Sequence, residues 1–268
     1  MALATVAILL EAAALTPAGA RAAAHGVGAP SLEATPSTSQ NWAGYAVTAH
    51  SQLRHVSGAW LQPTVRCEGL TDRYSAFWVG LGGFTSHARS LEQVGTEADC
   101  LGGQTSIYAW YELFPANAVR LQLTVQGADR ISAAVTVAGT RVSVDLRDLT
   151  SGRSVSRRLR MVEPETSSAE WIAEAPSECV GASRCQVLPL ADFSSITFEE
   201  DRVSNDDGLL GTIADPALSV TSLLLQSQAS RAGASTSALG GGATDEAAPS
   251  ALSGAGSSFT VVWRRHAS

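Results

Sequence analysis

Three stretches decide the fold class: Val119-Arg-Leu-Gln-Leu-Thr-Val, Ile131-Ser-Ala-Ala-Val-Thr-Val and Arg141-Val-Ser-Val-Asp-Leu-Arg. Apolar and polar residues alternate along each of them, which predicts strands with one buried and one solvated face. Short turn signals lie close to these stretches and indicate tight hairpins: Gly127-Ala-Asp, Ala138-Gly-Thr and Thr150-Ser-Gly. The sequence therefore predicts an antiparallel sheet.

The rest of the chain supports an all-β fold. Apolar residues at helical spacing are almost absent, and repeated strands without helices between them favour a sandwich or barrel. The 268 residues and 45% hydrophobic content suffice for a single domain with a large core. The Ala/Gly/Ser-rich stretch 229–257 is expected to be a long loop between two strands of one sheet.

Charge and composition exclude some partners. The net charge is −7, and all 18 basic residues are Arg. Because no basic patch is visible, we expect no binding to nucleic acid. The Ala, Gly and Arg content is typical of a GC-rich bacterial genome.

The first 40 residues differ from the rest. Residues 1–24 combine an apolar run with small residues before A-x-A sites, which predicts a secretory signal peptide, although Glu11 interrupts the run and no basic residue precedes it. An N-terminal helix is the alternative. The run is too short to span a bilayer. Residues 25–40 are expected to be a linker or short pro-segment, followed by one domain at 41–268. We expect a secreted, extracellular protein that does not contact a membrane after processing.

The four cysteines allow three pairings if all are oxidised. Cys179 and Cys185 flank a short segment around Gly181, which favours a small closed loop, and Cys67 would then pair with Cys100. Disulfides agree with secretion. No C-x-x-C motif or Cys/His cluster is present, so we expect no metal site and no cofactor.

Common hydrolase motifs are missing. The sequence has no G-x-S-x-G, no H-E-x-x-H and no Asp-Thr-Gly or Asp-Ser-Gly pair. Polar residues instead stand beside aromatic ones in strand-like runs, which is what a substrate groove on a sheet requires. These runs are Asn41-Trp42, Phe77-Trp78-Val79-Gly80, Leu91-Glu92-Gln93-Val94-Gly95, Ala109-Trp110-Tyr111-Glu112 and Ala169-Glu170-Trp171-Ile172.

In order and spacing these runs resemble the glutamic peptidases, or eqolisins, from about Asn41 to Trp263. The segments that carry the resemblance are Asn41-Trp-Ala-Gly-Tyr, Val56-Ser-Gly-Ala-Trp-Leu-Gln-Pro, Phe77-Trp-Val-Gly-Leu-Gly-Gly, Leu91-Glu-Gln-Val-Gly-Thr-Glu, Tyr108-Ala-Trp-Tyr-Glu-Leu-Phe-Pro, Asp148-Leu-Thr-Ser-Gly, Ala169-Glu-Trp-Ile-Ala-Glu and Pro189-Leu-Ala-Asp-Phe-Ser-Ser-Ile-Thr-Phe. The resemblance implies an antiparallel β-sandwich of two large sheets, like concanavalin A and other lectins.

The same resemblance implies the site. Gln93 and Glu170 match the family's catalytic pair, and Trp78 and Glu112 match positions that line the same cleft. Trp42 and Trp110 are expected to contact substrate as well. Where the family often carries Asp four residues after the tryptophan, this chain has Gly82, which removes an acid near the glutamate. Glu92 and Glu174 are expected on solvated strand faces.

The chemistry of these two groups fits peptide hydrolysis. Glu170 as a carboxylate can take a proton from water and return it to the leaving amine, while the Gln93 amide donates to the oxygen that becomes negative. With a carboxyl pKa of about 4.3, activity is expected at roughly pH 3–5. The expected partners are protein or peptide substrates, and the enzyme is expected to be a monomer.

Two other functions remain open. Paired carboxylates beside tryptophans also serve carbohydrates, so a lectin-like module or a glycosidase using Glu112 and Glu170 is the main alternative. A glycosidase of that kind would depend on Glu112 rather than on Gln93. A catalytically silent binding protein on the same fold is the third hypothesis.

Overall fold

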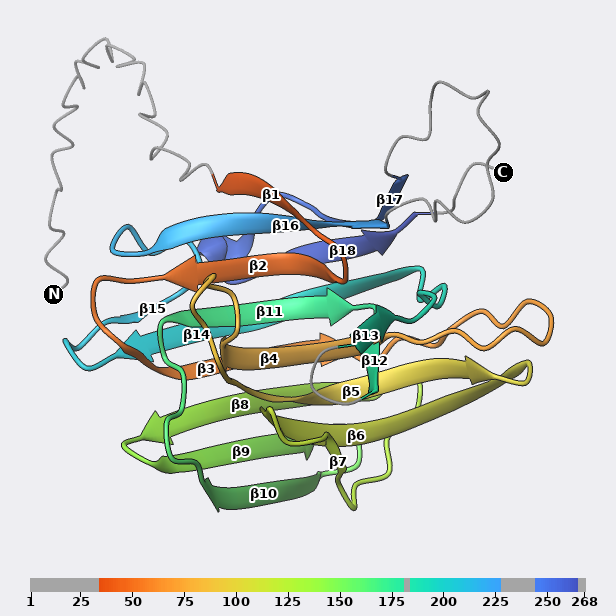
Figure 1. Ribbon diagram of the computed structural model, residues 1–268, viewed down its shortest axis with the longest axis horizontal. Coiled ribbons are helices and arrows are strands. Elements are labelled where there is room, and N and C mark those ends of the chain that lie inside the picture. The colour runs from red at the N-terminus through yellow and green to blue at the C-terminus, as the bar shows by residue number, and fades with distance from the viewer. Residues whose placement is uncertain (1–33, 181–183, 228–243, 265–268) are drawn as a thin grey trace, which may run out of the picture. The chain divides into compact units, whose positions relative to one another are not determined.

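The computed structural model describes residues 34–180, 184–227 and 244–264 (Figure 1). The predicted signal peptide, residues 1–24, lies outside the described residues. Within the described part, no helix is long and apolar enough to cross a membrane. The elements are β1 (Thr35–Ser39), β2 (Trp42–Thr48), β3 (Leu53–Leu61), β4 (Ala76–Gly82), β5 (Leu91–Leu101), β6 (Gln104–Phe114), β7 (Val119–Arg120), β8 (Arg130–Ala138), β9 (Arg141–Asp148), β10 (Arg153–Arg160), β11 (Ser168–Glu174), β12 (Ser177–Val180), β13 (Arg184–Val187), β14 (Ser195–Asn205), β15 (Leu210–Gly211), β16 (Ser219–Ser227), β17 (Thr244–Pro249), the 3₁₀ turn η1 (Gly254–Gly256) and β18 (Phe259–Trp263).

The predicted all-β sandwich class is confirmed, with one difference in its construction. Its two layers are halves of one curled sheet, with the order β10-β9-β8-β3-β14-β18-β17-β16-β2-β11-β4-β5-β6-β7. The half that begins at β10 packs against the half that ends at β7, because β8 and β9 contact β5 and β3 contacts β4 and β11. All neighbouring strands in this order are antiparallel. Outside this order, β15 pairs antiparallel with β14, and β1 pairs parallel with β16.

The predicted hairpins β8–β9–β10 show how the sequence pattern produces this layer. Every second residue of β8 and β9, such as Val135 and Val144, is buried in the core between the layers. Asp148 ends β9, and its Oδ1 accepts hydrogen bonds from the backbone N–H groups of Thr150 (2.9 Å) and Ser151 (3.1 Å). Gly152 follows with φ of 74°, a left-handed conformation that costs a glycine little.

The central strands β4, β5 and β11 are buried on both faces. Their inward residues belong to the main core between the layers, as Trp171 and Val94 do. Their other face carries a second apolar cluster that includes Trp78 and Ile172. Directly opposite Trp78 lies Gly95, where a Cβ atom would stand 2.6 Å from the Trp78 Cβ, so only glycine leaves room for this tryptophan.

Two sequence predictions about strand limits were wrong. Only Val119–Arg120 of the stretch 119–125 forms a strand, although the alternating burial of the later residues matches the prediction. The predicted loop 229–257 contains β17, which bridges β16 and β18, while residues 228–243 lie outside the described part. Ordered structure begins before Asn41, because β1 lies within the segment 25–40.

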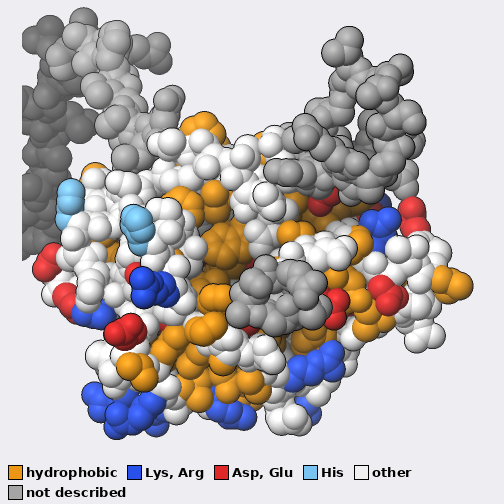
Figure 2. All heavy atoms as spheres, viewed as in Figure 1, with side chains coloured by type: hydrophobic (Ala, Val, Ile, Leu, Met, Phe, Trp, Pro, Cys, Tyr) orange, Lys and Arg blue, Asp and Glu red, His pale blue; other side chains and the backbone are white. Residues whose placement is uncertain are grey.

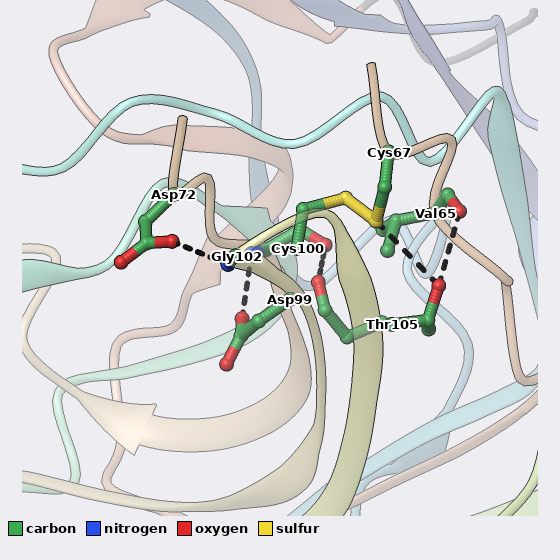
Figure 3. The surroundings of a disulfide bond; sticks show 9 residues. Val65, Cys67, Asp72, Asp99, Cys100, Gly102 and Thr105 are labelled. Carbon is green, nitrogen blue, oxygen red and sulfur yellow. Dashed lines mark hydrogen bonds between the residues drawn. A yellow bond between two sulfur atoms is a disulfide. The ribbon is translucent and has the colours of Figure 1, made fainter. Parts of the chain in front are cut away.

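The predicted disulfide between Cys67 and Cys100 is present (Figure 3). It ties the loop before β4 to the end of β5, and Asp72 on the same loop accepts a hydrogen bond from the Gly102 backbone N–H at 2.8 Å. Cys185 is also disulfide-bonded, and Cys179 stands opposite it in the β12–β13 ladder. The side chain of Cys179 lies outside the described residues, so the pairing of these two stays a prediction.

Replacing Cys67 and Cys100 together by Ala should lower the free energy of unfolding by about 3–4 kcal/mol, because the bond closes a loop across a sequence separation of 33 residues in the unfolded chain. Urea denaturation at fixed pH under non-reducing conditions measures the change. A midpoint equal to that of the parent protein would show that the bond adds no stability. The double substitution avoids the free thiol that a single change would leave.

Candidate active site

Four residues form one row across adjacent strands: Glu170 on β11, Gly80 on β4, Gln93 on β5 and Glu112 on β6. Residues directly opposite one another in a sheet point to the same face. Gly80 has no side chain, so the side chains of Glu170 and Gln93 are neighbours across it, with their backbones two strand spacings or about 10 Å apart. The structure thus brings together three of the predicted site residues.

Gln93 is held by its neighbour in the row. Its Nε2 donates a hydrogen bond to Glu112 Oε2 at 2.6 Å. Burial raises the pKa of Glu112, and this hydrogen bond partly offsets the rise. The contact fixes the orientation of the Gln93 amide and leaves its Oε1 buried without a hydrogen-bond partner within the described residues. An acceptor and a second amide hydrogen therefore remain available to a substrate or water.

Glu170 is completely buried and lacks partners. Both of its carboxylate oxygens are without a hydrogen bond in the described part of the chain. Burial raises the pKa of Glu170 well above its ordinary value, a nearby Ser168 hydroxyl lowers it, and the charges of Glu92 and Glu165 raise it further. Burial of an unpaired carboxyl is costly, which marks this position as a functional one.

The Glu170 carboxyl lies beneath the surface of the site. Leu91 Cδ1 and Trp78 Cζ3 each come within 3.0 Å of the place where a Cβ on Gly80 would stand. These two side chains cover the gap in the row, and Glu170 is absent from the lining of the pocket beside it.

A second acid, the half-buried Glu174, anchors the aromatic wall. Trp78 Nε1 donates to Glu174 Oε2 at 2.8 Å, and Asn41 Nδ2 donates to Oε1 at 2.9 Å. Burial raises the pKa of Glu174 to about 8. The rings of Trp42 and Trp78 meet edge to face with centroids 5.0 Å apart. The prediction of a solvated Glu174 was wrong. Its position four residues after Glu170 on one strand face could have indicated this role.

A pocket of about 400 Å³ opens beside the row. Gln93, Glu112, Trp42 and Trp110 line it, whereas Trp78 does not. Figure 2 shows apolar side chains gathered in the middle of the molecular face seen in Figure 1. Among the described residues, no group of three His, Cys, Asp or Glu side chains is placed to bind a metal. The pocket has the size and mixed lining of a binding site for a small molecule or a side chain.

Glu92, also predicted to be solvated, is fully buried. Its Oε1 accepts hydrogen bonds from Ser90 Oγ (3.0 Å) and from the Glu165 backbone N–H (3.2 Å). Burial raises the pKa of Glu92 to about 7.

Gly82 was expected to remove an acid near Glu170. Its missing side chain instead leaves room for another acid, because the Glu165 side chain occupies the space beside Gly82. Sequence reasoning missed Glu165, which lies in the loop before β11.

Comparisons with known proteins identify the family. The model of the Peptidase A4 family matches residues 40–244, which include the whole row and Glu174. The chain belongs to the Peptidase A4 family. Aspergillopepsin-2 of Aspergillus niger is 30% identical over 198 residues, which are 65% of this chain and 67% of that protein. The family resemblance stated from sequence is confirmed, and this Peptidase A4 member is a glutamic endopeptidase that acts on proteins or peptides.

Solved structures agree with this family. Scytalido-glutamic peptidase with a peptide-based transition-state analogue is 25% identical, has a TM-score of 0.65, and aligns over 84% of this chain and 98% of its own. The aspergilloglutamic peptidase of Aspergillus niger is 26% identical and has a TM-score of 0.52. The alignment covers 72% of this chain and 99% of that structure. This Peptidase A4 chain therefore shares the fold of glutamic peptidases over most of their length.

Proposed function

We propose that this Peptidase A4 protein hydrolyses peptide bonds with Glu170 as the general base and Gln93 as the group that stabilises the tetrahedral intermediate. The observation that carries the proposal is the row across β11, β4, β5 and β6, which places a buried unpaired carboxyl and an oriented amide on one face. Two such groups suffice for the acid–base and electrostatic steps of amide hydrolysis.

The proposed reaction begins with a water molecule between Glu170 and Gln93. The ionised Glu170 takes a proton from this water while the water oxygen forms a bond to the peptide carbonyl carbon. The carbonyl oxygen becomes negative and accepts a hydrogen bond from the Gln93 amide, while Gln93 Oε1 holds the attacking water. Glu170 then gives the proton to the amide nitrogen as the carbon–nitrogen bond breaks, which releases an amine and a carboxylic acid.

Substrate access follows from the covering of Glu170. Because Leu91 and Trp78 lie over Gly80, we infer that the Leu91 side chain rotates away when a peptide enters the pocket that it lines. Trp78 stays in place, since Glu174 holds its indole N–H. Trp42 and Trp110 then form the apolar walls for substrate side chains.

The raised pKa of Glu170 changes the expected pH range. Cleavage needs this carboxyl ionised, so activity falls as pH drops through its pKa. Because that pKa lies well above 4.5, we expect the acid limb at higher pH than the range of roughly pH 3–5 that a reference carboxyl predicts. The enzyme is proposed to work in weakly acid solution.

Gln93→Ala should lower kcat/KM for an acid-denatured protein substrate by about 10²–10³-fold, because it removes one donor to the intermediate. Glu112→Gln keeps a hydrogen-bonding neighbour for the Gln93 amide. This variant should lower kcat/KM by less than about tenfold, which is the effect of one altered hydrogen bond. Peptide release over a pH series measures both. A loss with Glu112→Gln that exceeds the loss with Gln93→Ala would contradict the proposed roles.

The carbohydrate hypothesis makes the opposite prediction for these two variants. A glycosidase with Glu112 and Glu170 needs both carboxyls and tolerates a change at Gln93. The structure speaks against such a pair, since three strand spacings, or about 14 Å, separate their backbones and the Gln93 amide binds the Glu112 carboxyl. Family membership also favours the peptidase.

We further propose that the protein is secreted and works as a monomer without a cofactor. The Cys67–Cys100 disulfide supports an oxidising compartment. The predicted signal peptide at 1–24 supports export by the same route. Removal of residues 1–24, with or without the segment 25–40, is checked by N-terminal sequencing of the exported protein.

A further inference from the structure

The end of β4 leaves an opening in the sheet that a distant loop fills. Gly82 has φ of 84°, a conformation that favours glycine. A Cβ atom on Gly82 would stand 2.5 Å from both Cβ and Cγ of Glu165, closer than atoms can approach. The stem of Glu165 therefore occupies the volume that any side chain at position 82 would need. Gly82 and Glu165 form a matched pair, and Glu165 lies three residues before β11, the strand that carries Glu170.

Hydrogen bonds on both sides of Glu165 keep it in this opening. Its carboxylate Oε1 accepts from the backbone N–H groups of Thr166 (3.1 Å) and Ser167 (3.0 Å). Its own backbone N–H donates to Glu92 Oε1 at 3.2 Å. Glu165 is thus an acid fixed in position beside the central row rather than a freely moving surface side chain.

Glu170 has charges of one sign around it. The residues facing it from neighbouring strands are neutral: Ala46 on β2, Gly80 on β4 and, one strand further, Gln93 on β5. The charged groups that act on it are the carboxylates of Glu92 and Glu165. Burial raises the pKa of Glu92 to about 7, so Glu92 itself is mostly neutral in acid solution. A like charge favours the protonated form of a buried carboxyl.

We propose that Glu165, seated in the space that Gly82 leaves free, is a positioning residue whose charge sets the pH at which Glu170 becomes the base of peptide cleavage. The proposal rests on the function assigned to Glu170 above. It explains why a buried carboxyl with no hydrogen-bond partner in the described structure has a second acid fixed near it. The pair makes Glu170 a proton acceptor only in weaker acid.

Glu165→Gln tests the proposal because it keeps the length of the side chain and an oxygen for the Thr166 and Ser167 N–H groups while removing the charge. The acid limb of kcat/KM should move down by about one pH unit, so that cleavage on that limb rises about tenfold while the plateau above it stays unchanged. Glu163→Gln, an exposed acid on the same loop, is the matched control and should leave the limb in place. Coincident pH profiles for Glu165→Gln and the parent enzyme would overturn the proposal.

Infrared titration separates this inference from the proposed function. The carboxyl band of Glu170, identified by its loss in Glu170→Gln, gives the midpoint of its titration without any substrate. In Glu165→Gln this midpoint should fall by about one pH unit, whether or not the protein cleaves the chosen peptide. Should Glu165→Gln not fold, Glu165→Met fills the same opening without a charge and should shift the midpoint in the same direction. An unmoved midpoint in a folded variant overturns the role of Glu165 and leaves the role of Glu170 standing.

Discussion

Glu170→Gln should reduce peptide cleavage by about 10²–10⁴-fold, the contribution of a positioned general base. The variant should also become more stable relative to the parent as pH rises. The reason is that the parent must ionise a buried carboxyl whose oxygens have no partner, whereas glutamine stays neutral at every pH. Initial rates at the parent's optimum give the first effect, and urea midpoints at pH 5 and pH 8 give the second.

The two readouts together identify a residue kept for function at a cost in stability. Glu163→Gln, which removes an exposed acid from the preceding loop, serves as the control and should change neither quantity. Full activity in Glu170→Gln would remove this residue from the mechanism. A stability difference that stays constant between pH 5 and pH 8 would show that the carboxyl is ionised in the folded protein over that range, as it is in the unfolded chain, so that burial does not raise its pKa.

The hairpin part of the fold could be predicted from sequence because one face of its strands is wet. In β8 and β9 the alternation between buried and more exposed residues follows the alternation of apolar and polar residues in the sequence. In β5 and β11 it is not, because both faces are covered and burial runs without interruption from Leu91 to Thr96 and from Ser168 to Ala173. A polar residue in such a strand is buried whichever way it points.

This difference explains the two wrong predictions at the site. Glu92 and Glu174 were placed on solvated faces by the logic of one-sided strands. Glu92 instead lies in a strand that is covered on both sides, and Glu174, at the end of β11, is half-buried and hydrogen-bonded to Trp78 and Asn41. The pair Gln93 and Glu170 was found through the order of several motifs rather than through any local property. Their separation of two strands depends on β4 lying between β5 and β11, which no local pattern specifies.

Glu165 was beyond prediction for a different reason. Its role depends on the absence of a side chain at Gly82, 83 positions earlier, and on the loop 161–167 folding back over the end of β4. The sequence shows only a glycine where an acid is expected. The structure shows that the acid comes from another part of the chain, so a missing motif residue need not mean a missing charge.

The free energy of unfolding should fall as pH rises from about 4.5 to about 8. Burial raises the pKa of Glu92 to about 7 and of Glu174 to about 8, and it also raises the pKa values of Asp99, Glu170 and Asp201. In this interval the folded protein binds more protons than the unfolded chain, so raising the pH favours unfolding. For Glu92 alone, a change from its ordinary 4.5 to about 7 corresponds to on the order of 3 kcal/mol.

One group opposes this trend. Burial lowers the pKa of His55 below its ordinary value of 6.5, so its contribution grows with pH, but this single histidine acts against several acids with raised pKa values. Thermal unfolding at pH 5, 6, 7 and 8 should give a melting temperature that decreases along the series. Asp201→Asn should flatten the decrease, because both Asp201 oxygens are buried without a partner in the described structure, whereas the exposed Asp207→Asn should not. A melting temperature that rises toward pH 8 would mean that these carboxyls ionise at no cost, through solvent that reaches them in the folded state.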